Sequence, residues 1–240
     1  MNKVKGLLII ILFSFSLAAC ANKTVYHVGD IVMDDGSVMA PAELESYEGA
    51  ARPMALIFSV TGGEHENSSR VLGVGLKASK GLVFAPEGSK GNETNVMENY
   101  SIVSAQEFNI TDGVFYSEGF LGLLDGRNTW KNVLKYDAEA KESFAGYPAY
   151  KYAVNYGIDK GFKKFQKGWY LPTASEAVAL SRCQLPDLPD LTDLPEIIWT
   201  SSQSYGAKNA CSVVDLSKSY VEAGHKELAF GVCSIYCFAE

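Results

Sequence analysis

Gly168-Trp169-Tyr170-Leu171-Pro172-Thr173 is followed, about thirty residues later, by Trp199-Thr200-Ser201-Ser202. Both stretches are led by aromatic residues, which favour β-strands. Between them the sequence predicts a helix over 173–181. Thr173 and Glu176 have the spacing of a capping box, in which each side chain satisfies a backbone N–H of the other residue. Two short strands that flank a short helix indicate an α+β chain.

Downstream of this pair the chain is expected to be mostly strand. Runs rich in Val, Ile, Tyr and Phe predict four strands, at 197–201, 210–216, 227–230 and 232–238. In the last of them, alternation puts Cys233, Ile235 and Cys237 on a face suited to the core. The opposite face is more mixed, and a ligand is expected there and at the loop 203–209.

The chain upstream of Gly168 also alternates between strand and helix patterns. Strands are expected at 26–32, 54–60, 71–76 and 82–85, and helices after Asp125 or Asn128 and from Tyr147-Pro148. Gly73 and Gly75 meet a relaxed dinucleotide-binding pattern. Because Ser79-Lys80-Gly81 follows where a helix should run, a pair of glycine-bearing strands is the favoured interpretation.

A proline-rich segment separates the helix from Trp199. Its leucines recur at every third residue, at 185, 188, 191 and 194. That period matches polyproline II, so the leucines fall along one edge. A loop that packs this edge on its own domain is favoured over a partner-binding motif.

The first twenty residues predict export and lipid attachment. Lys3 and Lys5 precede an apolar run that is short for a membrane span, and the run ends in Leu17-Ala18-Ala19-Cys20. This ending resembles the bacterial lipobox, in which the cysteine sulfur takes a diacylglycerol; a plain secretory peptide is the alternative. We therefore expect a signal peptide at 1–19, a lipidated tether at 20–24 beginning with Cys20, and one domain over 25–240.

The net negative charge of the chain argues against nucleic acid as a partner. The formal net charge of the 240 residues is −7, and removal of Lys3 and Lys5 would bring it to −9. Nucleic-acid binding needs clustered Lys and Arg that release counterions, so no nucleic acid is expected, and docking on anionic lipid by charge is not expected either. Four lysines lie within 160–167 and are interpreted as a solvated loop rather than a nucleic-acid patch.

The sequence predicts no catalytic residue, no metal and no cofactor. It has no G-x-S-x-G motif, no C-x-x-C pair and no pair of histidines at metal-binding spacing. Cys233 and Cys237 on one strand would lie about 13 Å apart, too far to bridge each other. Buried free thiols are the favoured state of Cys183, Cys211, Cys233 and Cys237.

These motifs carry a family resemblance. The two boxes, read as W-[YR]-L-P-[ST] and W-[ST]-S-[ST], resemble those of bacterial lipoproteins with a C-type-lectin fold of the formylglycine-generating-enzyme-like subtype. Tyr26-His27-Val28-Gly29-Asp30-Ile31-Val32 resembles the N-terminal part of the same group, so the likeness spans most of 26–238. The resemblance implies short twisted antiparallel strands with two to three helices.

Within that group, 199–238 resembles the variable region of proteins diversified by retroelements, particularly the treponemal variable lipoproteins. Diversification at the adenines of Asn-type codons yields residues such as Ser, Tyr, Asn, His and Phe but not Lys, Gln or Glu. The resemblance therefore implies these candidate ligand contacts: Ser204, Tyr205, Asn209, Ser212, Ser219, Tyr220, His225, Phe230, Ser234 and Tyr236. It implies this fixed framework: Gln203, Lys208, Lys218, Lys226 and Glu227.

The expected function is binding of a protein or other surface ligand by a non-enzymatic lipoprotein, anchored to a bacterial membrane and displayed on the outer membrane or cell surface. One alternative is an enzyme or a calcium-independent glycan binder on the same fold. The calcium-binding loop of animal lectins is interrupted in Gln184-Leu185-Pro186-Asp187, and the cysteine pair of sulfatase-modifying enzymes is matched only loosely by Cys233 and Cys237. A structural envelope lipoprotein is the other alternative.

Overall fold

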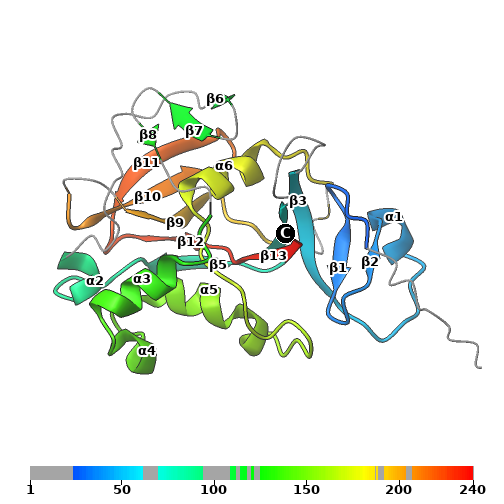
Figure 1. The fold of residues 1–240 in the computed structure, drawn as a ribbon, viewed down its shortest axis with the longest axis horizontal. Coiled ribbons are helices and arrows are strands. Elements are labelled where there is room, and N and C mark those ends of the chain that lie inside the picture. Colours follow the sequence, from blue (N-terminus) through cyan, green and yellow to red (C-terminus); the bar gives the residue numbers. More distant parts are fainter. Residues whose placement is uncertain are drawn as a thin grey trace, which may run out of the picture.

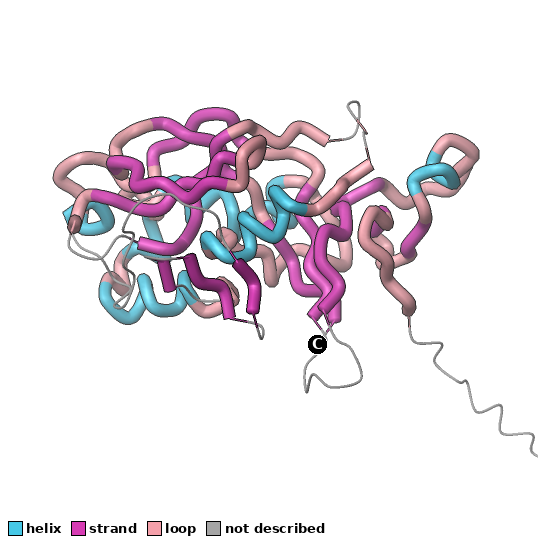
Figure 2. The backbone as a smooth tube through the Cα atoms, turned by 90° about the horizontal axis from the view of Figure 1, so that it is seen from above, coloured by secondary structure: helices cyan, strands magenta, loops and turns pink. Residues whose placement is uncertain are grey.

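The computed structural model describes residues 24–61, 70–93, 109–111, 114–117, 120–121, 125–186, 188, 192–203 and 207–239. These residues form an α+β structure with two five-stranded sheets and a small three-stranded one. Figures 1 and 2 show the two large sheets side by side. The predicted signal peptide, the Cys20 lipid site and the tether up to residue 23 lie outside the described residues.

The first large sheet has the order β13-β4-β3-β1-β2 and contains both ends of the described chain. Its strands are β1 (Ile31–Met33), β2 (Val38–Met39), β3 (Pro53–Thr61), β4 (Arg70–Gly75) and β13 (Ile235–Ala239). All four pairings are antiparallel. The last strand of the chain is thus hydrogen-bonded to a strand from its first third.

The second large sheet has the order β11-β10-β9-β12-β5. Its strands are β5 (Ser79–Val83), β9 (Ile197–Gln203), β10 (Ala210–Asp215), β11 (Tyr220–His225) and β12 (Ala229–Val232). Its pairings are antiparallel apart from that of β12 with β9, where Gly231 pairs with Ile198 in parallel. The small sheet joins β6 (Asn109–Thr111), β7 (Val114–Ser117) and β8 (Phe120–Leu121).

Six helical segments accompany the sheets in the described residues. They are α1 (Pro41–Leu44), α2 (Lys90–Glu93), α3 (Thr129–Tyr136), α4 (Ala140–Ser143), α5 (Pro148–Asp159) and α6 (Ala174–Arg182). Figure 1 shows α3, α4 and α5 gathered on one side of the second sheet. None of the helices in this part of the chain has the length and hydropathy that a membrane span requires.

Helix α6 joins the two sheets through one hydrophobic cluster. Ala177 and Val178 of the helix share this cluster with Leu56 of the first sheet and with Ile198 and Val214 of the second. The far side of the second sheet packs on the other helices: Trp199 lies in a cluster with Tyr150 of α5. Both faces of the sheet are therefore covered, which is why all of β10 is buried instead of every second residue.

Several expectations are confirmed. The helix predicted over 173–181 is α6, with Thr173 as its N-cap and the capping box in place. Gly73 and Gly75 lie in β4, which pairs with β3. Leu185, Leu188 and Leu194 pack against the core cluster, as expected for a loop folded on its own domain.

Two strand predictions need correction, and one strand was not predicted. The segment 232–238 is not one strand, because β12 ends at Val232 in the second sheet and β13 begins at Ile235 in the first. The segment around Tyr170 forms only a single bridge, with Ile235. Strand β11 was not predicted, since its small and charged residues lack a strand pattern; its pairing with β10 holds it in place.

Candidate functional site

A buried carboxylate fixes the start of α6 against the first sheet. Glu176 Oε2 accepts the backbone N–H of Thr173 at 2.9 Å and that of Gly126 at 3.2 Å. Its Oε1 accepts Nη2 of Arg70 at 2.7 Å and the hydroxyl of Tyr170 at 2.9 Å. Burial and the neighbouring carboxylate raise the pKa of Tyr170, so its hydroxyl remains a donor. Four donors satisfy one buried acid, and this gives a rigid base for the segments that follow.

Four of the candidate contacts lie at opposite ends of the β10–β11 hairpin. Ala210 pairs with His225 at one end, where Asn209 also lies, and Asp215 pairs with Tyr220 at the other, beside Ser219. Five residues of strand separate the two ends, which corresponds to about 17 Å. One small ligand cannot contact both ends.

Two candidate contacts lie in the interior. Ser212 on β10 and Ser234 between β12 and β13 are fully buried. A ligand on the surface cannot reach either hydroxyl, and both residues are removed from the set of direct contacts. They are buried because β10 is covered on both faces and because the chain passes between the sheets at Ser234.

The aromatic candidates Phe230 and Tyr236 are half-buried and belong to different sheets. The Phe230 ring lies 5.0 Å from Trp199 in the second sheet, and the Tyr236 ring lies 5.3 Å from Trp169 beside the first. These rings pack mainly on the core, so they do not extend the surface at either end of the hairpin. Ser204 and Tyr205 lie outside the described residues.

Polar side chains contact one another in series at the Asn209 end of the hairpin. Nδ2 of Asn209 lies 3.3 Å from Nδ1 of His225, and that nitrogen lies 3.9 Å from a carboxylate oxygen of Glu227. The second Glu227 oxygen accepts Nδ2 of Asn92 at 3.3 Å. These polar contacts connect the Asn209 end of the hairpin to the segment around α2.

The Ser219 end is a tight turn held by Asp215. Its Oδ1 accepts the backbone N–H and hydroxyl of Ser217 and the backbone N–H of Lys218, and its Oδ2 lies 2.7 Å from Nζ of Lys218. Hydrogen bonds from Lys218 and Ser217 lower the pKa of Asp215 to about 2. Ser219 adopts a left-handed conformation with φ of 58°, and its hydroxyl lies 2.8 Å from that of Ser181 on α6. The turn is therefore docked on the helix.

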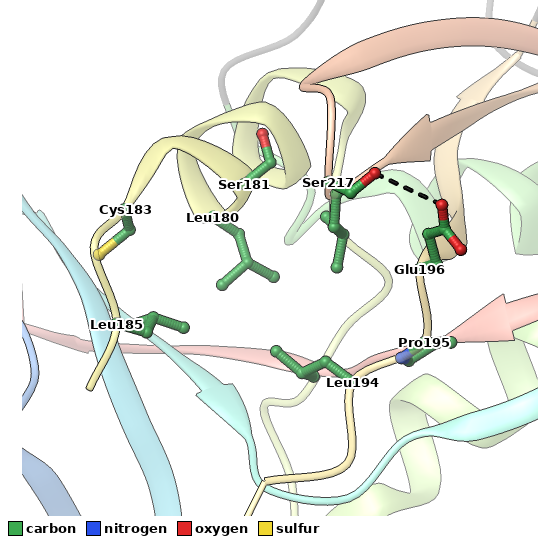
Figure 3. Close-up of a pocket in the computed structure, with 9 residues that line it drawn as sticks. Leu180, Ser181, Cys183, Leu185, Leu194, Pro195, Glu196 and Ser217 are labelled. Atoms are coloured by element: carbon green, nitrogen blue, oxygen red, sulfur yellow. Dashed lines mark hydrogen bonds between the residues drawn. The ribbon is translucent and has the colours of Figure 1, made fainter. Parts of the chain in front are cut away.

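An open cleft of about 380 Å³ adjoins this turn. Figure 3 shows the side chains of Leu180, Leu185 and Leu194 directed toward one space, with Cys183 at its edge. Ser217 and Glu196 form a polar rim, joined by a hydrogen bond of 3.4 Å. An apolar floor with a few polar groups and a volume of this size is typical of ligand sites. We call this the hairpin cleft.

Sequence reasoning missed the hairpin cleft, and the candidate contacts nearest to it in the chain, Ser219 and Tyr220, are not among the residues that line it. Three of the leucines that line the cleft, Leu180, Leu185 and Leu194, come from α6 and the proline-rich loop, before the region 199–238, and only Leu216 comes from within it. The leucine repeat was interpreted correctly as packed on the domain. Nothing in its spacing indicates that Leu185 and Leu194 leave a space between them.

The thiols are poorly suited to nucleophilic chemistry. Cys211 and Cys233 are buried, and burial raises the pKa of each to about 12, so neither forms a thiolate at neutral pH. All four cysteines of the described residues are free. Across these same residues, no group of three or more His, Cys, Asp or Glu side chains is placed to hold a metal ion.

Lys226 occupies an unexpected position. It is fully buried, and its Nζ donates to the backbone oxygen of Gly91 at 2.8 Å. Burial lowers the pKa of Lys226 to about 8. No sequence pattern indicates that this lysine is buried. Charged side chains are rarely buried unless they find polar partners.

The comparisons with known proteins identify no relative: no protein-family model, curated protein or solved structure matches the chain.

Proposed function

We propose that the chain is a lipid-anchored surface protein of C-type-lectin fold that binds a protein or other surface ligand without catalysis. The lipobox ending in Cys20 supports the anchor. The aromatic boxes at Trp169 and Trp199 support the fold, together with the α+β architecture of two short-stranded sheets.

The observation that carries the proposal is the hairpin cleft beside Ser219 and Tyr220. Its walls come from α6, the proline-rich loop and the β10–β11 turn. This turn is held in one conformation by the hydrogen bond that Asp215 accepts from Ser217 and by the one that Ser181 donates to Ser219. A rigid frame loses little conformational entropy when a ligand binds. Tyr220 is 39 % exposed at the edge of the frame, and tyrosine offers a large contact area with few rotatable bonds.

Of the candidate ligand contacts, only those at the two ends of the hairpin fit this proposal. Ser219 and Tyr220 form the ligand edge, and the pair Asn209 and His225 forms a separate polar surface at the other end of the hairpin. A ligand that covers both must be macromolecular, since a standard protein interface of about 800 Å² per partner spans such a distance.

Site-specific photo-crosslinking on intact cells tests this proposal. A photoreactive phenylalanine analogue at Tyr220 is expected to yield a discrete adduct with a surface ligand. The same analogue at Tyr136, 48 % exposed on α3, is the matched control and is expected to give none. Equal adduct patterns at the two positions, or no adduct at Tyr220, would contradict the proposed binding edge.

Two further measurements address the anchor and diversification. The Cys20→Ser variant is expected to lose incorporation of labelled fatty acid. If the region 199–238 is diversified, the genome holds a near-copy of its coding segment that differs at adenines, beside a reverse transcriptase. Absence of such a copy would leave a surface-binding protein without diversification.

A further inference from the structure

A second cavity lies away from the hairpin, between the start of β3, the end of β4 and the C-terminal end of α5. Its volume is about 220 Å³, and its lining includes Arg52, Leu76, Lys77, Tyr156, Lys160 and Phe162. None of these residues belongs to the region 199–238. The cavity also shares no lining residue with the hairpin cleft, so it is independent of that cleft and of the proposed function.

Three cationic side chains surround the cavity. Within the described residues, Nζ of Lys77 and Nζ of Lys160 make no hydrogen bond or ion pair. Nε of Arg52 bonds to Asp34 at 3.1 Å, and its Nη2 donates to two backbone oxygens. Asp34 balances one of the three positive charges, and Nη1 of Arg52 has no acceptor in the described part of the chain. The excess charge favours an anionic occupant.

Tyr156 supplies a buried donor with no acceptor. Its side chain is almost completely buried, and its hydroxyl oxygen accepts the backbone N–H of Lys77 at 3.1 Å. The hydroxyl proton itself has no acceptor among the described residues. Burial raises the pKa of Tyr156 to about 12, so the proton stays in place at neutral pH. Buried donors normally have partners, and an acceptor in the cavity would provide one.

Two aromatic rings form the apolar wall. The rings of Tyr156 and Phe162 lie 5.8 Å apart. Nζ of Lys160 lies 5.7 Å from the centre of the Tyr156 ring, and Cζ of Arg52 lies 5.8 Å from that of Phe162. Cation–π attraction holds both charges beside the rings. The cavity volume of about 220 Å³ is enough to hold one ring.

We propose that this cavity binds a small carboxylate carried on a single ring, with the carboxylate toward Lys77, Lys160 and the Tyr156 hydroxyl and the ring against Phe162. Such a ligand would accept hydrogen bonds from the two lysines and the Tyr156 hydroxyl. Its negative charge matches the positive charge of the lining, and its ring fits the cavity volume. A neutral ring leaves the lysines without an ion pair.

Calorimetric titration of the purified full-length protein in detergent tests the proposal. Benzoate and glucuronate are the probes, and benzyl alcohol and glucose are their neutral counterparts. At least one carboxylate is expected to bind, and its counterpart is expected to bind at least about tenfold more weakly, because it lacks the charge-assisted hydrogen bonds. The Lys77→Gln and Lys160→Gln variants are each expected to weaken binding by about five- to tenfold.

The Lys163→Gln variant is the matched control, because Lys163 is exposed in the segment that follows α5 but does not line the cavity. Its affinity is expected to stay within about twofold of the unmodified protein. The Tyr156→Phe variant retains the ring and loses the donor, so it too should bind the carboxylate more weakly. The proposal is overturned if neither carboxylate binds, if the neutral counterparts bind equally well, or if Lys163→Gln weakens binding as much as Lys160→Gln.

Discussion

Nη2 of Arg70 lies 2.7 Å from Oε1 of Glu176, whose side chain is 2 % exposed. The pair joins the first residue of β4 to the first turn of α6. Because α6 contributes to the core cluster shared by the two sheets, this ion pair helps to hold both sheets in one arrangement.

The Glu176→Gln variant is expected to lower the free energy of unfolding by about 2 kcal/mol, because the partly buried Arg70 guanidinium loses its shorter ion pair and keeps the longer one with Asp125, at 3.6 Å. Urea denaturation followed by circular dichroism measures the change. The Glu142→Gln variant, at an exposed position on α4, is the control and should change stability by less than about 0.5 kcal/mol. A loss below about 1 kcal/mol for Glu176→Gln would show that the ion pair does not secure α6.

A comparison of two glycines tests the packing of Tyr236. Gly168 and Gly161 both have positive φ, at 101° and 68°. A methyl group at Gly168 would lie 2.8 Å from the Tyr236 ring, whereas one at Gly161 would meet no atom within 4 Å. Gly168→Ala is therefore expected to cost more stability than Gly161→Ala, by about 1–2 kcal/mol beyond the backbone strain that both share. Equal shifts in the thermal unfolding midpoints of the two variants would contradict this packing.

The sequence predicts the parts of the fold that depend on local signals. The capping box at Thr173 and Glu176 locates α6, and the apolar run from Met54 locates β3. Strand β11 is not predictable in this way, because Glu222, Ala223 and Gly224 give no strand pattern and only the hydrogen bonds to β10 define it. Strand pairing between distant segments has no local signature.

The candidate site shows the same limit. The codon argument selects residue types and not positions in space, so it groups buried Ser212 and Ser234 with exposed Tyr220. The codon argument also cannot show that the segment 232–238 is divided between the two sheets. Tyr236 therefore lies in the first sheet, whereas the hairpin belongs to the second. Ser219 is half-buried and Tyr220 is exposed at the turn that adjoins the hairpin cleft, and the codon argument gives no indication of the cleft itself.

The four cysteines of the described residues should differ in reactivity. Cys183 and Cys237 are half-buried, whereas Cys211 and Cys233 are buried with pKa values of about 12. Iodoacetamide is expected to modify Cys183 and Cys237 in the native protein and all four in denaturant, since the thiolate is the reactive form. Peptide mapping by mass spectrometry measures the extent at each site. Native labelling of Cys211 or Cys233 as fast as that of Cys183 would contradict the burial described here.

The turn at Asp215 should contribute stability that depends on pH. Its folded pKa of about 2 lies below the ordinary value of 3.8, so the contribution is complete above about pH 5 and is lost as the pH falls through 2. The Asp215→Asn variant is expected to be less stable than the unmodified protein by about 1 kcal/mol at pH 6, a magnitude reduced by solvent screening, and by only about a third of that difference at pH 2.5. Urea denaturation at the two pH values measures the difference. In a Lys218→Gln background the difference should shrink, because the ammonium group that lowers the pKa of Asp215 is absent. A difference that is the same at both pH values would mean that the charge of Asp215 does not hold the turn beside the hairpin cleft.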